Sequence, residues 1–151
     1  MFTRKQLDIF KFCCEEIERQ RDGVVKAFYM LEAWRAADDD HRASGGQLDE
    51  SLIKRWHALA MPHMVKAGVY RLTDLTLDTG GRVGVHWSDV PRKMRELVGA
   101  VSSLSPSEFY KEFLDIHCFY DGNGRTAKIV YNYLLDSLHD PQLPPRFWPG
   151  D

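Results

Sequence analysis

The stretch HCFYDGNGRTAK, residues 117–128, concentrates residue types that can hold a phosphate group. Gly122 and Gly124 carry no Cβ atom, so their backbone amides can approach a ligand closely. A helix that starts near Gly124 would add the positive end of its dipole at the same point. Arg125 offers a planar fork to phosphate oxygens, and Lys128 follows three residues later on the same helical face. The spacing therefore predicts a phosphate site.

Two more side chains of this stretch indicate the chemistry that would accompany the phosphate. Asp121 is a hard oxygen ligand, which suits Mg²⁺ bridging a polyphosphate. His117 stands at the entrance of the loop, where a neutral imidazole could take a proton from an attacking hydroxyl. Together these features predict transfer of a phosphate-containing group. The plainer alternative, a common DGNG turn beside a structural histidine, leaves Arg125 and the following helix unexplained.

Two helices must position this loop. The sequence Ser105-Pro106-Ser107-Glu108 is a capping box with proline in the first turn, and it predicts a helix through about Ile116. Apolar residues from Ala127 to Leu138 recur at helical spacing and predict the helix after the loop. Residues 117–123 then form a tight loop that opens onto a helix N-terminus.

Helical spacing of apolar residues predicts three helices earlier in the chain, on Leu7 to Ile17, Val24 to Trp34 and Leu52 to Leu59. The first is expected to turn Leu7, Phe10, Cys14 and Ile17 inward. The polar stretch 38–47 is predicted to be an exposed loop, because it combines an acidic triplet with paired glycines.

Residues 70–87 change period and predict the chain's one β-hairpin. Two β-prone runs, 72–77 and 83–87, flank Asp78-Thr79-Gly80-Gly81. Ser88 is the expected cap of a further helix that carries apolar residues from Val90 to Val101. The sequence thus predicts a mainly α domain with one small hairpin.

Composition excludes several classes of protein. The chain has 151 residues, enough for one domain (1–151), and its net charge of −2 gives no general attraction to nucleic acid or to a membrane. No apolar run reaches the roughly 18 residues of a membrane span, and the N-terminus lacks the pattern of a secretory signal. Cys13, Cys14 and Cys118 show no C-x-x-C spacing and are expected to be reduced thiols. We expect a cytoplasmic protein; delivery into a host cell stays open.

The motif resembles the signature of the Fic domain family, H-P-F-x-D-G-N-G-R-x-x-R. Seven specified positions match: His117, Phe119, Asp121, Gly122, Asn123, Gly124 and Arg125. The sequence AGVYR, residues 67–71, is similar to the A-G-x-Y-R that precedes the flap hairpin of this family. The likeness covers about residues 20–138 and leaves a proline-rich tail, 139–151, outside it. It implies a Fic-type bundle of about six to eight helices with a short hairpin flap.

The resemblance also implies an activity, protein adenylylation (AMPylation): AMP passes from ATP to a Ser, Thr or Tyr hydroxyl of a target protein. His117 would be the general base, Asp121 the Mg²⁺ ligand, and Phe119 the buried anchor of the loop. Gly122, Asn123 and Gly124 would hold the phosphates, Arg125 would neutralise the leaving phosphates, and Lys128 would face the terminal phosphate. The flap, about Thr76 to His86, would pair with an extended segment of the target by strand addition.

Two departures from the signature keep alternatives open. Cys118 replaces the usual proline, and Lys128 replaces the final arginine and so loses the bidentate fork. Transfer of UMP or phosphate, the latter as in the related Doc kinases, is one alternative, although Doc proteins have A-N-K in place of Gly122-Asn123-Gly124. A Fic-fold binding module that has lost its chemistry is another.

Many Fic proteins are restrained by a glutamate in the motif [ST]-x-x-x-E-[GN]. This chain contains no such motif. A separate antitoxin-like inhibitor, as in toxin–antitoxin pairs, or an unrestrained enzyme would each account for that.

Overall fold

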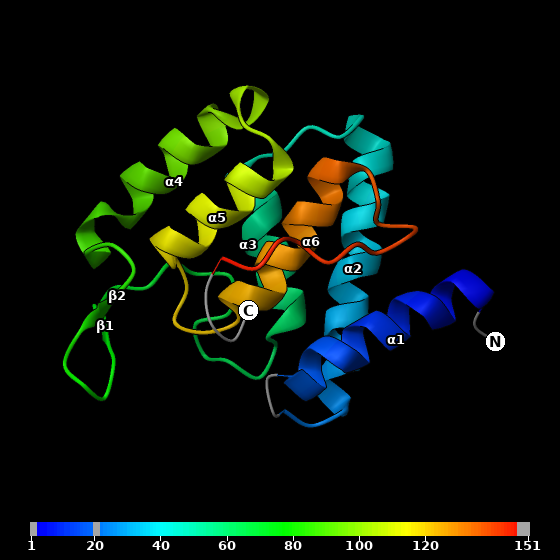
Figure 1. Ribbon diagram of the computed structural model, residues 1–151, viewed down its shortest axis with the longest axis horizontal. Coiled ribbons are helices and arrows are strands. Elements are labelled where there is room, and N and C mark those ends of the chain that lie inside the picture. The colour runs from blue at the N-terminus through cyan, green and yellow to red at the C-terminus, as the bar shows by residue number, and fades with distance from the viewer. Residues whose placement is uncertain (1–2, 20–21, 148–151) are drawn as a thin grey trace.

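The computed structural model describes residues 3–19 and 22–147, and it shows a helical bundle with one hairpin at its edge (Figure 1). Residue 20, the predicted start of the family likeness, and residues 148–151 of the tail lie outside this range. The helices are α1 (Arg4–Arg19), α2 (Val25–Ser44), α3 (Glu50–Ala60), α4 (Val90–Gly99), α5 (Pro106–Ile116) and α6 (Asn123–Leu135). Short 3₁₀ turns at Trp87–Asp89 and Val101–Ser103 flank α4. The mainly α prediction is confirmed.

The hairpin consists of β1 (Leu75–Thr76) and β2 (Arg82–Val83), which pair antiparallel with Leu75 opposite Val83. Its position was predicted correctly, but its strands are shorter than the two β-prone runs. The hairpin projects away from the bundle beside the lower end of α5 (Figure 1). None of the described helices combines the length and the apolar character needed to cross a bilayer.

Helix α6 forms the centre of the bundle and packs against α2, α3 and α5. Every residue from Arg125 to Tyr133 is buried, whichever way its side chain points. A helix buried on all faces cannot shift without disturbing its neighbours. The loop that precedes α6 is therefore anchored from behind by the core.

The prediction of a loop at residues 38–47 is wrong, because α2 continues to Ser44 and ends at Gly45 in the left-handed region (φ 67°). The acidic residues are compatible with a helix because cations neutralise them. Asp38 accepts a hydrogen bond from Arg42 one turn later, at 2.7 Å. Asp40 pairs with Arg55 of α3. Asp38 thus pairs within α2 and Asp40 joins α2 to α3, and the helix continues through both residues.

The predicted inward face of α1 is rotated by about one residue. Cys13, Glu16 and Ile17 are buried, whereas Leu7 is half exposed and Cys14 is only partly covered. The rotation turns the carboxylate of Glu16 toward the core. A charge in that position needs a partner, and α6 supplies one, as described below.

The capping box before α5 is confirmed in both directions. The Ser105 hydroxyl accepts from the Glu108 amide at 3.1 Å, and the Glu108 carboxylate accepts from the Ser105 amide at 3.1 Å. Before α4, in contrast, Ser88 is not the cap; the His86 ring accepts from the Ser88 amide at the start of the 3₁₀ turn. Leu138 is buried as predicted but lies beyond the end of α6.

Candidate functional site

His117 ends α5 and opens the predicted loop. Its backbone is in the left-handed region (φ 54°), a conformation that a non-glycine residue adopts only where its surroundings hold it. Its amide still donates to the Phe113 carbonyl at 3.1 Å, so the last turn of the helix is intact. The helix end and the left-handed turn together fix the direction in which the imidazole leaves the backbone.

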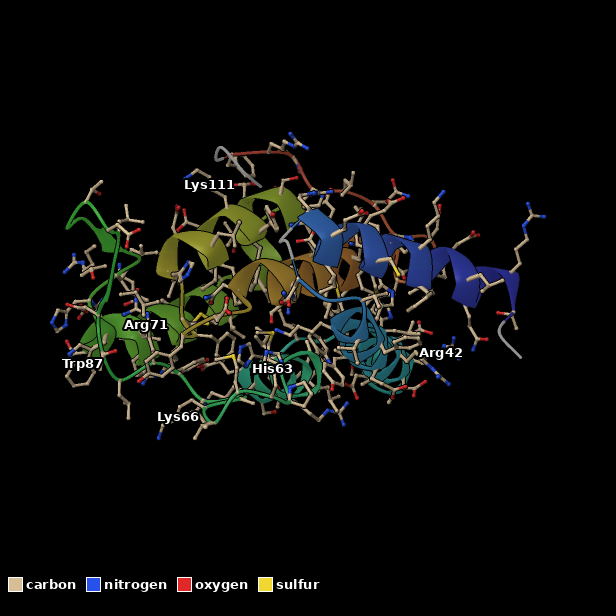
Figure 2. All side chains as sticks on the ribbon, turned by 90° about the horizontal axis from the view of Figure 1, so that it is seen from below. Arg42, His63, Lys66, Arg71, Trp87 and Lys111 are labelled. Carbon is tan, nitrogen blue, oxygen red and sulfur yellow. The ribbon has the colours of Figure 1, made fainter. Side chains whose placement is uncertain are left out.

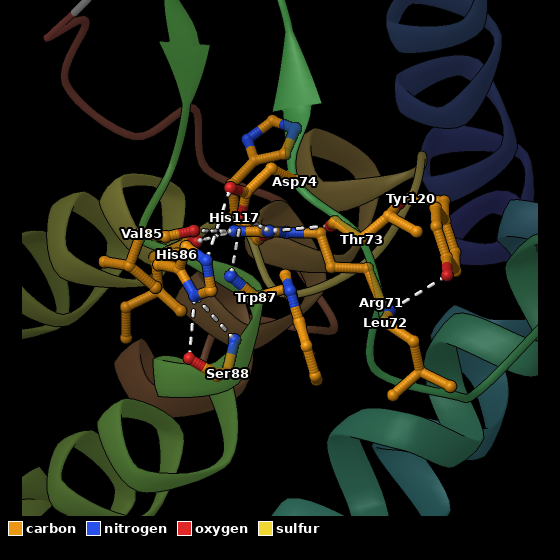
Figure 3. A network of polar contacts seen from close by, with 11 residues as sticks. Arg71, Leu72, Thr73, Asp74, Val85, His86, Trp87, Ser88, His117 and Tyr120 are labelled. Atoms are coloured by element: carbon orange, nitrogen blue, oxygen red, sulfur yellow. Dashed lines mark hydrogen bonds and ion pairs between the residues drawn. The ribbon is translucent and has the colours of Figure 1, made fainter.

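A single buried guanidinium holds this turn in place (Figure 3). Arg71 donates from Nε to the His117 carbonyl at 2.6 Å and from Nη2 to the Ile116 carbonyl at 3.2 Å. The same side chain donates to the carbonyls of Val85, after the hairpin, and Thr73, before it. Arg71 therefore joins the base of the hairpin to the end of α5.

The hairpin approaches the histidine closely at Gly84. A Cβ atom at this position would lie 2.6 Å from the Ile116 carbonyl oxygen and 2.7 Å from the His117 Cβ. The backbone of Gly84 is also left-handed (φ 75°). The segment after β2 thus packs on His117 with no room for a side chain, which places the hairpin beside the imidazole.

Burial lowers the pKa of His117, and the nearby positive charge of Arg71 lowers it further. Imidazole has an ordinary pKa of about 6.5. The His117 ring is therefore predominantly neutral at pH 7 and able to accept a proton.

The other end of the loop is held by Asn123 and Phe119. The Asn123 side chain accepts from the Phe119 amide at 3.0 Å and donates to the Phe119 carbonyl at 2.9 Å. The Phe119 ring is buried, as predicted for an anchor, and it stacks on the ring of His57 at 3.7 Å. These contacts close the loop into a rigid unit.

Gly122 caps the N-terminus of α6 in the left-handed region (φ 79°), and a Cβ atom there would lie 2.7 Å from Met61. Since glycine has no side chain, it does not cap the amides of the first helical turn as Ser or Asp would. The helix dipole adds a partial positive charge at this point. The start of α6 has the chemistry of an anion site.

The two cations of the motif are buried and paired in this structure. Arg125 lies 2.6 Å from the carboxylate of Asp22, in the segment between α1 and α2. Lys128 lies 3.0 Å from the carboxylate of Glu16 on α1. The N-terminal part of the chain therefore places a carboxylate on each cation that sequence reasoning assigned to phosphate.

Asp121 is exposed, and its Oδ1 accepts from the Gly122 amide at 2.8 Å. No group of three or more His, Cys, Asp or Glu side chains is placed to hold a metal ion in the part of the chain that the structure describes. Mg²⁺ can bind through a single protein carboxylate when a polyphosphate and water supply its other ligands. The donor set fits Mg²⁺ bound together with a nucleotide.

Cys118, in the position of the signature's proline, is fully buried. Burial raises the pKa of its thiol far above the ordinary range, so the thiolate is scarce at neutral pH. Its carbonyl accepts from the Arg71 amide at 3.0 Å. The residue packs and is not a nucleophile in this conformation.

His86 and Trp87 make ordinary structural bonds at the base of the hairpin. The Trp87 amide donates to Asp74 at 2.8 Å, and the His86 ring pairs with the Ser88 hydroxyl at 2.7 Å. The Trp87 ring lies at the outer edge of the molecule, on the same side as the hairpin (Figure 2). These contacts stabilise the hairpin base and leave the Trp87 ring partly exposed.

The structure brings the predicted site residues together along one loop and one helix start. Sequence reasoning missed the roles of three others: Glu16, Asp22 and His57. Glu16 gave no signal in the sequence, because it lies outside the predicted inward face of α1 and only the structure shows it buried beside Cys13 and Ile17. The sequence also gave no indication of the roles of Asp22 and His57, because only the folded chain brings them close to the motif.

Comparisons with known proteins agree with this geometry. The model of the Fic/DOC family matches residues 47–135, more than half of the chain. A Fic domain-containing signalling protein from Bacteroides thetaiotaomicron has a similar structure, with a TM-score of 0.63 and 21% identity over 74% of this chain. A Fic family protein from Desulfovibrio desulfuricans is similar with a TM-score of 0.66 and 18% identity over 87% of this chain. The chain spans about half of each of these proteins, 47% in both cases.

Proposed function

The chain belongs to the Fic/DOC family, whose members generally transfer AMP or another phosphate-containing part of a nucleotide, and we propose that it is a protein adenylyltransferase. Its substrates would be ATP and a Ser, Thr or Tyr hydroxyl of a target protein. The observation that supports this most directly is the neutral, half-buried His117 on the loop that leads into the glycine-capped start of α6. A base and an anion site thus lie on one rigid loop.

In the proposed reaction, the His117 imidazole accepts the proton of the target hydroxyl. The hydroxyl oxygen forms a bond to the α-phosphorus of ATP, and the bond from that phosphorus to the bridging oxygen of the β-phosphate breaks. Pyrophosphate leaves with the electron pair of that bond. Arg71 contributes by holding the His117 backbone, and its charge adds to partial burial in lowering the pKa of the imidazole.

The start of α6 would hold the phosphates. Backbone amides at Gly122, Asn123 and Gly124 would be the donors, in a loop that Asn123 and Phe119 already close. The Gly122 amide donates to Asp121 Oδ1 in this structure and would exchange that partner for a phosphate oxygen. Arg125 would neutralise charge on the leaving phosphates. Asp121 would hold Mg²⁺, which supplies positive charge to the polyphosphate when it is bound.

The two carboxylates on α1 and after it support a proposal of restraint, because each is paired with a cation of the motif. Nucleotide phosphates compete with Asp22 for Arg125 and with Glu16 for Lys128. We propose that nucleotide binding requires these pairs to open. The chain thus carries a candidate restraint of its own, and a separate antitoxin-like inhibitor remains a second proposal that binding experiments can test.

The hairpin is the proposed docking element for the target. Its strands form a two-stranded ribbon whose outer edges are available for pairing, next to Gly84 and His117. An extended target segment added to Thr76 or Arg82 would run past the imidazole. The target therefore needs an accessible extended stretch that carries a hydroxyl.

A second candidate is transfer of UMP or of the terminal phosphate. Lys128 favours it, because lysine lacks the bidentate fork of the signature's arginine and is already bound to Glu16. The nucleotide could then lie in the site in another orientation. ATP labelled at the α- or the γ-phosphate distinguishes transfer of AMP from transfer of the terminal phosphate, and UTP labelled at the α-phosphate tests transfer of UMP. The His117→Ala variant tests the base.

A further inference from the structure

We propose that His57 is a positioning residue that holds the Asp121 end of the loop in the conformation needed to bind Mg²⁺ and nucleotide. This inference rests on the proposed function of Asp121. His57 lies on α3, is fully buried, and is 64 residues away from Asp121 in the sequence. Its Nε2 lies 2.8 Å from the Asp121 carbonyl oxygen.

The hydrogen bonds of His57 define its tautomer. The Gly68 amide donates to Nδ1 at 2.9 Å, so Nδ1 has no hydrogen. Nε2 therefore carries the hydrogen of the neutral ring and donates it to the Asp121 carbonyl. Both nitrogens are engaged, and each fixes a different segment: the turn that contains Gly68 and the loop that contains Asp121.

The bond to the carbonyl fixes the peptide plane between Asp121 and Gly122. At one end of this plane the carbonyl accepts from His57, and at the other end the Gly122 amide donates to Asp121 Oδ1. The orientation of the carboxylate is thus tied to the plane, and the plane is tied to α3. The stacking of His57 on Phe119, with an interplanar angle of 11°, prevents the ring from tilting.

Three substitutions separate these contacts. His57→Gln places an amide nitrogen near the position of Nε2 and keeps the donor to Asp121. His57→Asn places a carbonyl oxygen near the position of Nδ1 and keeps the acceptor for Gly68. His57→Phe keeps the stacked ring and removes both hydrogen bonds.

We expect the variants to differ in their affinity for Mg²⁺ and in their KM for ATP. His57→Asn and His57→Phe weaken the apparent affinity for Mg²⁺ and raise the KM for ATP by about tenfold, the size typical of groups that orient a metal ligand. Their kcat at saturating Mg²⁺ and ATP stays within about threefold of wild type. His57→Gln restores the affinity for Mg²⁺. Equal loss in Gln, Asn and Phe variants, or a loss confined to kcat, overturns the proposal.

Direct calorimetry of ATP binding in the presence of Mg²⁺ gives a readout that does not depend on transfer. If the wild type binds the nucleotide but transfers nothing, the proposed function fails while the order of affinities among the variants still tests His57. Ile53→Ala, one turn earlier on α3 and also fully buried, is the control for loss of stability. It lowers Tm without changing the affinity for Mg²⁺; a matching loss of affinity in this control contradicts a specific role for His57.

Discussion

The ammonium group of Lys128 lies 3.0 Å from the carboxylate of Glu16, and both side chains are almost completely buried. A buried ion pair contributes little net stability, but the loss of one partner is costly because the other charge stays buried. Arg125 and Asp22 repeat the arrangement one turn earlier on α6, at 2.6 Å. The first helix and the segment after it thus hold both cations of the motif.

Replacement of Glu16 by glutamine is expected to strengthen nucleotide binding and to weaken the fold. Lys128 loses its counter-charge, so unfolding costs about 3 kcal/mol less, while a phosphate can now take the place of the carboxylate. We expect an affinity for ATP in the presence of Mg²⁺ about tenfold above wild type, measured by calorimetry, and a lower Tm that the nucleotide partly restores. Glu15→Gln, an exposed neighbour, is the matched control and changes neither quantity. Unchanged affinity in the Glu16 variant would count against restraint by this pair.

The Asp22 carboxylate makes stability depend on pH. Hydrogen bonds from Lys26 and Arg125 hold its pKa well below the ordinary value of about 3.9. A group whose pKa is lower in the folded state stabilises the fold above its unfolded pKa and loses that contribution as pH falls toward the folded value. Acid unfolding monitored by circular dichroism should therefore be less steep below about pH 4 in Asp22→Asn than in the wild type. If the stability of both proteins fell equally steeply with pH, the ion pair of Asp22 with Arg125 would contribute nothing to the pH dependence of folding.

Gly84→Ala tests the close approach of the hairpin to the histidine. The added methyl group meets the Ile116 carbonyl and the His117 Cβ, and the left-handed backbone is strained in addition. We expect a loss of about 1–3 kcal/mol in stability and a loss of transfer of more than tenfold. Gly80→Ala is the control, because Gly80 has a similar φ of 88° and open space around it. If the Gly84 variant were as active as the Gly80 variant, the close approach of the hairpin to His117 would not matter for transfer.

Arg71→Gln tests how the base is kept neutral. Burial lowers the pKa of His117 and the positive charge of Arg71 lowers it further, so removal of that charge raises the pKa and leaves more imidazolium at a given pH. The acid limb of the pH profile of kcat/KM should move to higher pH, and kcat should fall because the His117 backbone loses its tie. Arg95→Gln, on the exposed face of α4, leaves the profile in place. An acid limb that stays at the same pH in Arg71→Gln would contradict the assignment of His117.

The local features of the site could be predicted from the sequence because they depend on short-range chemistry. The capping box at Ser105 and the glycine-capped start of α6 both follow from residues within four positions of each other. The hairpin was predicted in place for the same reason. Where a polar stretch had long-range partners, as Asp40 has in Arg55 and Trp56, the prediction of a loop was wrong.

The contacts that hold the site could not be predicted, because they join segments far apart in the chain. Lys128 meets Glu16 across 112 positions, and Asp121 meets His57 across 64. A periodic pattern indicates which side of a helix faces inward. It does not show which charged side chain of a neighbouring helix will lie against that side. The half-exposed Leu7 and the buried Glu16 illustrate the point, since the face of α1 that is buried includes a carboxylate paired with Lys128.

We propose that His117 serves as the base for transfer of AMP. The most direct test incubates the protein and its Glu16→Gln variant with cell lysate, Mg²⁺ and ATP labelled at the α- or the γ-phosphate. We expect that label from the α-phosphate reaches a protein target and that an added His117→Ala substitution abolishes this transfer. Label from the γ-phosphate alone would mean a kinase. No label from either position, even in the Glu16→Gln background, would contradict adenylyl transfer. UTP labelled at the α-phosphate would then separate UMP transfer from a Fic fold that has kept only its binding surfaces.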